Sequence, residues 1–242
     1  MRQSHLQNKT VLITGCAKGL GRASALHLAN AGATVIGHYH TSQTEAQQLL
    51  LELQHHSPQS TMHQADLRSE KQVNTMMQEI YNQHQRIDIL INNVGSFIYK
   101  PFAEVEYTEF QDVIATNLSA TFLCSKLVVA KMREQRFGRI INYGCAGADR
   151  LVIRELTTPY YIAKSGVISL TKIFAHTYAS DGITVNAISP GILETSIADV
   201  KKIPAGRRAS FDDILNALDF LLDPKSEYIN GANIEVAGGW MF

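Results

Sequence analysis

The sequence predicts a doubly wound α/β protein, a single domain of about seven parallel strands with helices on both faces. Short apolar, β-branched runs alternate with helix-length stretches along the 242 residues, which is typical of βαβ units and a parallel sheet. Several of these runs are continuously apolar, as strands covered on both faces are. The chain has no internal repeat, low-complexity segment or Pro- or Ser-rich linker. We therefore expect one domain over residues 1–242.

The expected elements follow one another as strand and helix. The first strand is a run of Val, Leu, Ile and Thr, a glycine-rich turn then opens a helix, and the later strands are equally short. The strands are expected at residues 11–14, 34–36, 61–64, 87–91, 139–142, 183–188 and 233–236, and the longer helices at 44–54, 69–84, 110–136 and 161–178. Ligands of such sheets bind beyond the carboxyl ends of the strands, where the strand order reverses. Candidate functional residues are therefore those just after each strand.

Charge and composition exclude several classes of function. The chain has 22 Lys and Arg residues and 22 Asp and Glu residues. This balance provides no net positive potential to attract nucleic acid or an anionic membrane. No apolar run approaches the ~20 residues of a membrane helix, and residues 1–9 have no apolar stretch typical of a signal peptide. Three widely spaced cysteines form no metal-ligand pattern. We expect a cytoplasmic protein with reduced thiols and no metal.

A glycine-rich turn directly follows the first strand. Residues 14–21 read Thr-Gly-Cys-Ala-Lys-Gly-Leu-Gly and open a helix. Glycines allow a sharp turn and a close approach of the backbone to a pyrophosphate, and the free N–H groups of the helix start attract the anion. An ordinary tight strand-to-helix turn is the alternative. The strand before and the helix after favour a dinucleotide site.

The spacing Thr-Gly-x-x-x-Gly-x-Gly resembles that of the short-chain dehydrogenase/reductases. Further matches follow in that family's order: Ala65-Asp66-Leu67, Asn92-Asn93-Val94-Gly95, Asn117, Tyr160-x-x-x-Lys164, Pro190-Gly191 and Gly238-Gly239. They cover nearly the whole chain, and the pattern is most similar to 3-oxoacyl-carrier-protein reductases. The resemblance implies a Rossmann-type fold and an oxidoreductase that transfers a hydride between a nicotinamide cofactor and a carbonyl or alcohol.

The resemblance also implies which residues contact the cofactor. Asp66 and Leu67 would contact the adenine, Asn92 would brace the central strands, and Thr195 would bond the nicotinamide amide. The full predicted cofactor set is Gly15, Lys18, Gly19, Leu20, Gly21, His40, Asp66, Leu67, Asn92, Gly95, Tyr160, Lys164, Pro190, Gly191, Ile192 and Thr195.

The segment after the second strand favours NADP(H) over NAD(H). An NAD site usually places an acidic residue there, against the ribose 2′-hydroxyl. Residues 37–42 contain no carboxylate, and the first one after this strand is that of Glu45. Lys18 lies inside the glycine-rich turn, where relatives that use NADP often carry Lys or Arg, and His40 adds a donor. The alternative is that Lys18 is a solvated surface lysine and His40 a bystander.

Tyr160 and Lys164 are the predicted catalytic pair. They are four residues apart, so on a helix their side chains share a face, and a neighbouring ammonium favours the phenolate that a proton-transfer catalyst needs. By the resemblance, Lys164 also holds the nicotinamide ribose and Asn117 anchors a water in the proton relay. Tyr161 is the rival donor, but it lies three residues from Lys164, so we assign it to the substrate side or to packing.

The serine that the family normally carries after the fifth strand is missing. When residues 138–142 are aligned with the fifth strand of the family, Cys145 falls at the position of the serine. A thiol is only a weak hydrogen-bond donor. Three alternatives follow: Cys145 substitutes with a weaker bond, Thr157 or Thr158 replaces it, or the chain catalyses poorly and still binds cofactor. Loss of one such donor typically costs about 10²–10³ in rate.

The substrate side is expected to be open. The substrate loop near residues 192–209 is short for the family, which suggests a bulky or carrier-linked carbonyl substrate. Candidate apolar walls are Phe97, Ile98, Tyr99, Leu151 and Ile153, with packing at the surface or at an interface as the alternative for each. Helices 110–136 and 161–178 match those through which relatives associate, so we expect a homodimer or homotetramer with residues 240–242 at a contact.

Two functions of different classes remain. One is an NADP(H)-dependent ketoreductase that uses Tyr160, Lys164, Asn117 and Cys145. The other is a catalytically weak or inactive dinucleotide-binding scaffold or sensor, which the missing serine and the short loop support. A scaffold has no need of Tyr160, Lys164 and Asn117 together, so the enzyme is favoured.

Overall fold

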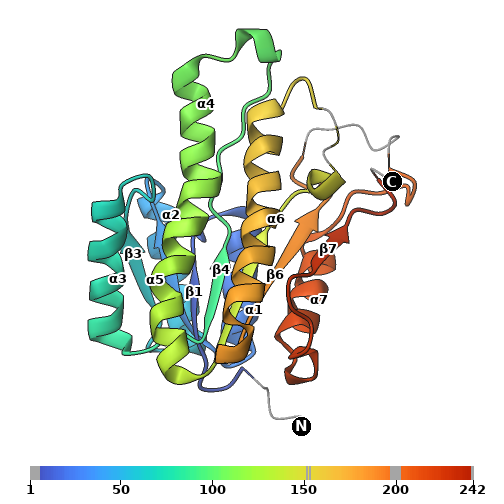
Figure 1. The fold of residues 1–242 in the computed structure, drawn as a ribbon. Helices are drawn as coiled ribbons and strands as arrows, with labels where there is room; N and C mark the ends of the chain where they lie inside the picture. The colour runs from blue at the N-terminus through green and yellow to red at the C-terminus, as the bar shows by residue number, and fades with distance from the viewer. Residues whose placement is uncertain (1–5, 151, 153, 197–202, 241–242) are drawn as a thin grey trace.

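The fold is one parallel sheet between two layers of helices (Figure 1). The structure is a computed structural model and describes residues 6–150, 152, 154–196 and 203–240. The seven strands lie in the order β3-β2-β1-β4-β5-β6-β7, and every neighbouring pair is parallel. The order reverses between β1 and β4, which is where such sheets bind ligands. The predicted doubly wound fold is confirmed.

The strands are short and lie within a few residues of their predicted positions. They are β1 (Thr10–Ile13), β2 (Thr34–Tyr39), β3 (Thr61–Gln64), β4 (Ile89–Asn92), β5 (Gly138–Tyr143), β6 (Ile183–Pro190) and β7 (Asn233–Val236). The four-residue strands β1 and β4 are buried throughout, because they form the centre of the sheet and helices cover both of its faces.

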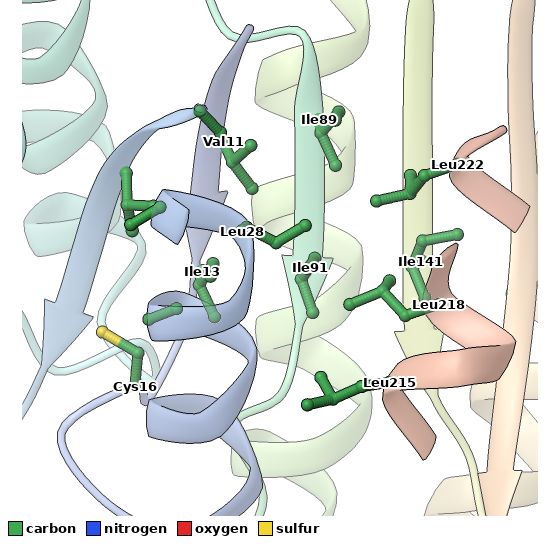
Figure 2. Packing of buried hydrophobic residues seen from close by; sticks show 14 of the residues in the cluster. Val11, Ile13, Cys16, Leu28, Ile89, Ile91, Ile141, Leu215, Leu218 and Leu222 are labelled. Atoms are coloured by element: carbon green, nitrogen blue, oxygen red, sulfur yellow. The ribbon is translucent and has the colours of Figure 1, made fainter. Parts of the chain in front are cut away.

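Each face of the sheet has its own apolar core. The first core packs β1 and β4 against α1 (Gly19–Asn30), α2 (Gln43–His56) and α7 (Phe211–Leu222). Figure 2 shows Leu28 of α1 and Leu215, Leu218 and Leu222 of α7 directed at Ile13, Ile91 and Ile141 of the strands. The second core packs the other face against α3 (Glu70–His84), α5 (Ala120–Gln135) and α6 (Thr158–Tyr178).

One long helix on the second face is interrupted by a π-helical turn. α4 (Tyr107–Ile114) runs into a π-turn at Ala115–Ser119, and α5 continues from it. The whole stretch Tyr107–Gln135 is long and apolar enough to cross a membrane by length and composition alone. Its apolar residues instead pack on the sheet, because Cys124, Val128, Val129 and Met132 belong to the second core. We interpret it as a core helix of the fold.

Candidate active site

Two glycines of the glycine-rich turn after β1, Gly15 and Gly21, have no space for a side chain. Gly15 has φ of 64°, and a Cβ there would lie 2.7 Å from Val94 Cγ2. A Cβ on Gly21 would lie 2.6 Å from the Gly15 carbonyl oxygen. α1 begins at Gly19, and its N-cap residue Lys18 makes no side-chain capping bond. The helix start therefore offers backbone N–H groups at a point where a pyrophosphate can approach closely.

His38, which the sequence did not single out, holds this turn in place. The Gly15 N–H donates to His38 Nδ1 over 3.0 Å, and His38 Nε2 lies 3.0 Å from the Ala65 carbonyl oxygen. Because Nδ1 accepts, the proton of the neutral ring resides on Nε2 and is donated to Ala65. Burial lowers the pKa of His38 to about 4. The imidazole thus joins the first turn, β2 and the end of β3 as a neutral group.

A pocket of about 320 Å³ opens beside the turn, at the carboxyl edge of β1, β2 and β3. It is lined by Gly15, His38, His40, Asp66, Leu67, Arg68, Val94, Asp112 and Thr116. Arg68 Nη2 lies 2.8 Å from Asp66 Oδ2 and Arg68 Nη1 lies 2.6 Å from Asp112 Oδ1. The Arg68 guanidinium lowers the pKa of Asp66 to about 2. Asp66 therefore stays an ionised acceptor in a pocket of the size that small ligands occupy.

Lys18 already has a partner. Its Nζ lies 2.6 Å from Glu45 Oε1, although the Lys18 side chain is 61% exposed. Glu45 lies in the first turn of α2, so the helix returns its carboxylate to the glycine-rich turn. In the sequence, Glu45 lies beyond residues 37–42, the segment expected to meet the cofactor ribose. His40 Nε2 lies 3.9 Å from Asp66 Oδ2 at the rim of the same pocket.

The π-turn orients Asn117. Its Nδ2 donates to the carbonyl oxygens of Ser96 and Val113 at 2.9 and 3.0 Å. Its Oδ1 is buried and has no hydrogen-bond partner among the residues that the structure describes. A Cβ on Gly95 would lie 2.2 Å from Oδ1, so glycine is required there. Such π-turns are frequent at functional sites, and an orphaned buried acceptor fits a site completed by a water or ligand.

Tyr160 and Lys164 lie one turn apart near the start of α6. Lys164 is buried, its Nζ donates to the Tyr143 carbonyl oxygen over 2.7 Å, and Nζ lies 5.6 Å from the centroid of the Tyr160 ring. Burial lowers the pKa of Lys164 to about 8. Burial, with the neighbouring Cys145 and Tyr161, raises the pKa of Tyr160 well above its ordinary value. At neutral pH the tyrosine keeps its proton and the lysine its charge.

Cys145 follows β5 and adjoins both tyrosines. Its Sγ lies 3.8 Å from the Ala146 carbonyl oxygen, and burial raises the pKa of the thiol. Tyr161 is buried and donates to the Ala146 carbonyl oxygen over 2.8 Å, so its hydroxyl serves packing. The Thr158 hydroxyl donates to the Arg154 carbonyl oxygen over 2.7 Å. Thr158 is therefore committed to the backbone rather than to the place of a serine.

The remaining predicted residues lie at the same edge of the sheet. Asn92 Nδ2 donates to Asn142 Oδ1 over 2.8 Å and to Ser125 Oγ over 3.0 Å, which joins β4, β5 and α5. Pro190 ends β6, Gly191 N–H donates to the Val236 carbonyl oxygen, and Ile192 is buried. Thr195 is exposed. Residues 197–202 of the predicted substrate loop lie outside the described residues, as do Leu151, Ile153, Met241 and Phe242.

A family model described as short chain dehydrogenase matches residues 9–204. The chain belongs to the short-chain dehydrogenase/reductase family. The 3-oxoacyl-(acyl-carrier-protein) reductase FabG of Staphylococcus epidermidis is 34% identical over 96% of this chain and 98% of its own length. A solved short chain dehydrogenase from Bacillus anthracis aligns with a TM-score of 0.90 at 29% identity, over 97% of each chain.

A further solved structure, from Agrobacterium tumefaciens and proposed to be a gluconate dehydrogenase, aligns with a TM-score of 0.92 at 30% identity over 100% of this chain and 99% of that one. As a short-chain dehydrogenase/reductase, the protein is an oxidoreductase that acts on CH–OH or C=O groups with a nicotinamide cofactor. The close-packed glycines Gly15 and Gly21 and the helix start fit such a cofactor, and the unpartnered Asn117 Oδ1 fits a bound water.

Proposed function

We propose that the protein is an NADPH-dependent ketone reductase similar in activity to the 3-oxoacyl reductases. The observation that carries the proposal is Tyr160 one helical turn from the buried Lys164, whose Nζ lies 5.6 Å from the centroid of the Tyr160 ring. A tyrosine that keeps its proton at neutral pH donates that proton and is a poor base. The pair is therefore better matched to carbonyl reduction than to alcohol oxidation. The substrate is a small or carrier-linked ketone.

Each side chain has a distinct role in the proposed reduction. A bound nicotinamide supplies the hydride that the carbonyl carbon accepts. Tyr160 Oη donates its proton to the carbonyl oxygen, and the Lys164 ammonium stabilises the phenolate left behind. Cys145 offers a weak hydrogen bond to the same oxygen. Asn117 Oδ1 accepts from a water that returns a proton to Tyr160, and the committed hydroxyl of Tyr161 takes no part.

NADPH is proposed over NADH because Lys18 lies in the glycine-rich turn and His40 lines the pocket that opens beside it. Lys18, with His40 nearby, would meet a 2′-phosphate there, while Gly15, Gly19, Leu20 and Gly21 would hold the pyrophosphate. Glu45 opposes this choice, because its carboxylate pairs with Lys18 at 2.6 Å. A bound 2′-phosphate would have to displace that exposed pair, which costs little in water.

The assembly and location are part of the proposal. An apolar groove of about 420 Å³ runs along α5 and α6 and is lined by Leu118, Phe122, Leu123, Leu170 and Ile173, among others. Exposed apolar patches of this kind mark protein–protein contacts. We assign this face to contact with a second copy of the chain, as a homodimer or homotetramer. The free cysteines, Cys16 and Cys124 among them, and the balanced charge support a location in the cytoplasm.

Tyr160→Phe tests the reductase against the scaffold. The variant removes the donated proton and keeps the ring packing, so turnover is expected to fall at least about 10²-fold with the Kd for NADPH unchanged. Oxidation of NADPH at 340 nm, with an acetoacetyl thioester, a diketone and a bulky cyclic ketone as substrates, measures it. Turnover that does not change in Tyr160→Phe, or its absence in both proteins despite NADPH binding, favours the scaffold.

A further inference from the structure

Arg154 lies in the loop between β5 and α6, and its guanidinium contacts two aromatic rings, an arrangement that we call the clamp. The carbon of its guanidinium lies 4.7 Å from the centroid of the Trp240 ring and 5.3 Å from that of the Tyr161 ring. The rings fix the position of the planar cation through cation–π contacts and leave its N–H donors in the plane. Trp240 comes from beyond β7, so the clamp joins two loops at the carboxyl edge of the sheet.

Two of the nitrogen donors of this guanidinium lack acceptors. Nε and Nη2 of Arg154 are buried and make no hydrogen bond to any part of the chain that the structure describes. Arg150, four residues earlier, shows the ordinary arrangement, because its Nη2 lies 2.9 Å from Glu235 Oε2. A guanidinium cannot lose its proton in a protein, and a buried unpaired cation is costly. Such a group is suited to an anion that arrives from outside the chain.

The position of Arg154 relates this anion site to the catalytic residues. Burial raises the pKa values of Cys145 and Tyr161, and the Arg154 charge acts on both in the opposite direction. Cys145 in turn adjoins Tyr160. Cys145 is therefore a neighbour of both Arg154 and Tyr160. The Tyr161 ring that Arg154 contacts lies 6.3 Å, between centroids, from the Tyr160 ring, so we expect one small ligand to span from Tyr160 to Arg154.

We propose that Arg154 is a specificity-determining residue that binds a carboxylate of the substrate, so that the preferred substrate is a short oxo acid rather than its neutral ester. The proposal rests on the reductase function above, adds a negative charge to the substrate and selects the small ketone over the carrier-linked one. A carboxylate would accept from Nε and Nη2 in the bidentate geometry that this pair of donors offers. The alternative role is structural, with Arg154 serving only to pack Trp240 against Tyr161.

Matched acids and esters separate these roles. Acetoacetate and ethyl acetoacetate present the same ketone with and without the charge, and levulinate with methyl levulinate moves the carboxylate one bond further away. We expect the wild type to reduce one of the acids with a kcat/KM at least tenfold above that of its ester. Arg154→Gln is expected to lower kcat/KM for that acid roughly 10–100-fold and to leave the ester within about twofold.

Two further variants guard against a folding artefact. Arg154→Lys keeps the charge and loses the planar fork, so it should retain part of the preference for the acid. Arg150→Gln removes a nearby arginine that is already paired, and it should behave as the wild type does. An equal loss for acid and ester in Arg154→Gln, or no preference in the wild type, overturns the proposal in favour of the packing role.

A binding measurement keeps this inference separate from the reductase function. Acetoacetate and ethyl acetoacetate are titrated into each protein saturated with NADP⁺, and binding is followed by NMR. If no ketone is reduced, the reductase proposal fails, yet acetoacetate that binds the wild type and Arg150→Gln but not Arg154→Gln still supports the anion site. Acetoacetate that binds no better than the ester in the wild type overturns the anion site, whatever the turnover.

Discussion

A thiol in place of a hydroxyl at position 145 sets the expected catalytic rate. Cys145 lies against the Ala146 carbonyl and beside both tyrosines, and its S–H is a weak donor. We predict that Cys145→Ser raises kcat about tenfold or more, because a hydroxyl binds the developing charge on the substrate oxygen more strongly. Steady-state oxidation of NADPH measures it, with Cys145→Ala as the control. A serine variant no faster than the alanine variant would show that position 145 does not contact that oxygen.

The ion pair between Lys18 and Glu45 is expected to control the preference for NADPH over NADH, because the Glu45 carboxylate occupies the Lys18 ammonium. Glu45→Gln leaves Lys18 available, so we predict that the Kd for NADPH falls roughly three- to tenfold while that for NADH hardly changes. Lys18→Gln should raise the Kd for NADPH by a similar factor. Fluorescence titration with both cofactors measures these values. Arg22→Gln is the matched control, because Arg22 pairs with Glu52 over 2.6 Å between the same two helices. Equal effects on NADH and NADPH would contradict a 2′-phosphate site.

At the scale of elements, His38 joins the first turn to β2 and β3, and its titration links that junction to pH. The unfolded chain takes up the proton near pH 6.5, whereas folded His38 takes it up only near pH 4. The contribution of neutral His38 to the free energy of unfolding is therefore complete above pH 6.5. This contribution, about 3 kcal/mol, is lost as the pH falls from 6.5 through 4. Asp66, whose pKa is lowered to about 2 by Arg68, loses its own contribution at lower pH.

Urea unfolding between pH 7.5 and 4 tests this prediction. His38→Asn offers Gly15 an uncharged acceptor, so we expect a variant that is less stable at pH 7.5 but whose free energy of unfolding falls less steeply with pH. His55→Asn alters an exposed histidine on α2 and should follow the wild type. A His38→Asn curve parallel to that of the wild type would show that His38 does not control the pH dependence.

The elements were predictable where a local pattern specifies them. The central strands β1 and β4 have their apolar runs, and β3 and β7 lie at the predicted residues. α7 was not predicted as a helix, although Ser210 and Asp213 form a capping box before apolar residues at helical spacing. The π-turn at Ala115–Ser119 interrupts a sequence that reads as one continuous helix. Nothing local indicates it, because Asn117 is positioned by bonds to Ser96 from another segment.

At the scale of the whole molecule, the parallel sheet gathers residues from distant parts of the chain at one edge. The sequence order of the motifs was enough to predict this gathering, since every strand of a parallel sheet ends at the same edge. It was not enough to predict the pairing of side chains there. Glu45 reaches Lys18 and Trp240 reaches Arg154 only because helix α2 and the segment after β7 bring them back. Such contacts depend on loop paths that local patterns do not encode.

The apolar face of α5 and α6 leads to the last prediction. Phe122 is 40% exposed and Ile173 is 59% exposed, and both line the groove between these helices. Burial of such a face in a symmetric contact is favourable by roughly 25 cal/mol per Å² of apolar surface, and a charge placed there must be desolvated. We predict that Ile173→Glu shifts the protein to its 26.8 kDa monomer while the wild type sediments as a dimer or tetramer.

Sedimentation velocity over a hundredfold range of concentration measures the assembly. Leu51→Glu is the matched control, because Leu51 is 73% exposed on α2, which covers the opposite face of the sheet. Turnover of the Ile173→Glu monomer is then informative, since Tyr160 and Lys164 occupy the same helix as Ile173. A wild type that is monomeric at all concentrations would leave the exposed face of α5 and α6 without its proposed partner. An Ile173→Glu protein that still associates would place the contact on another surface.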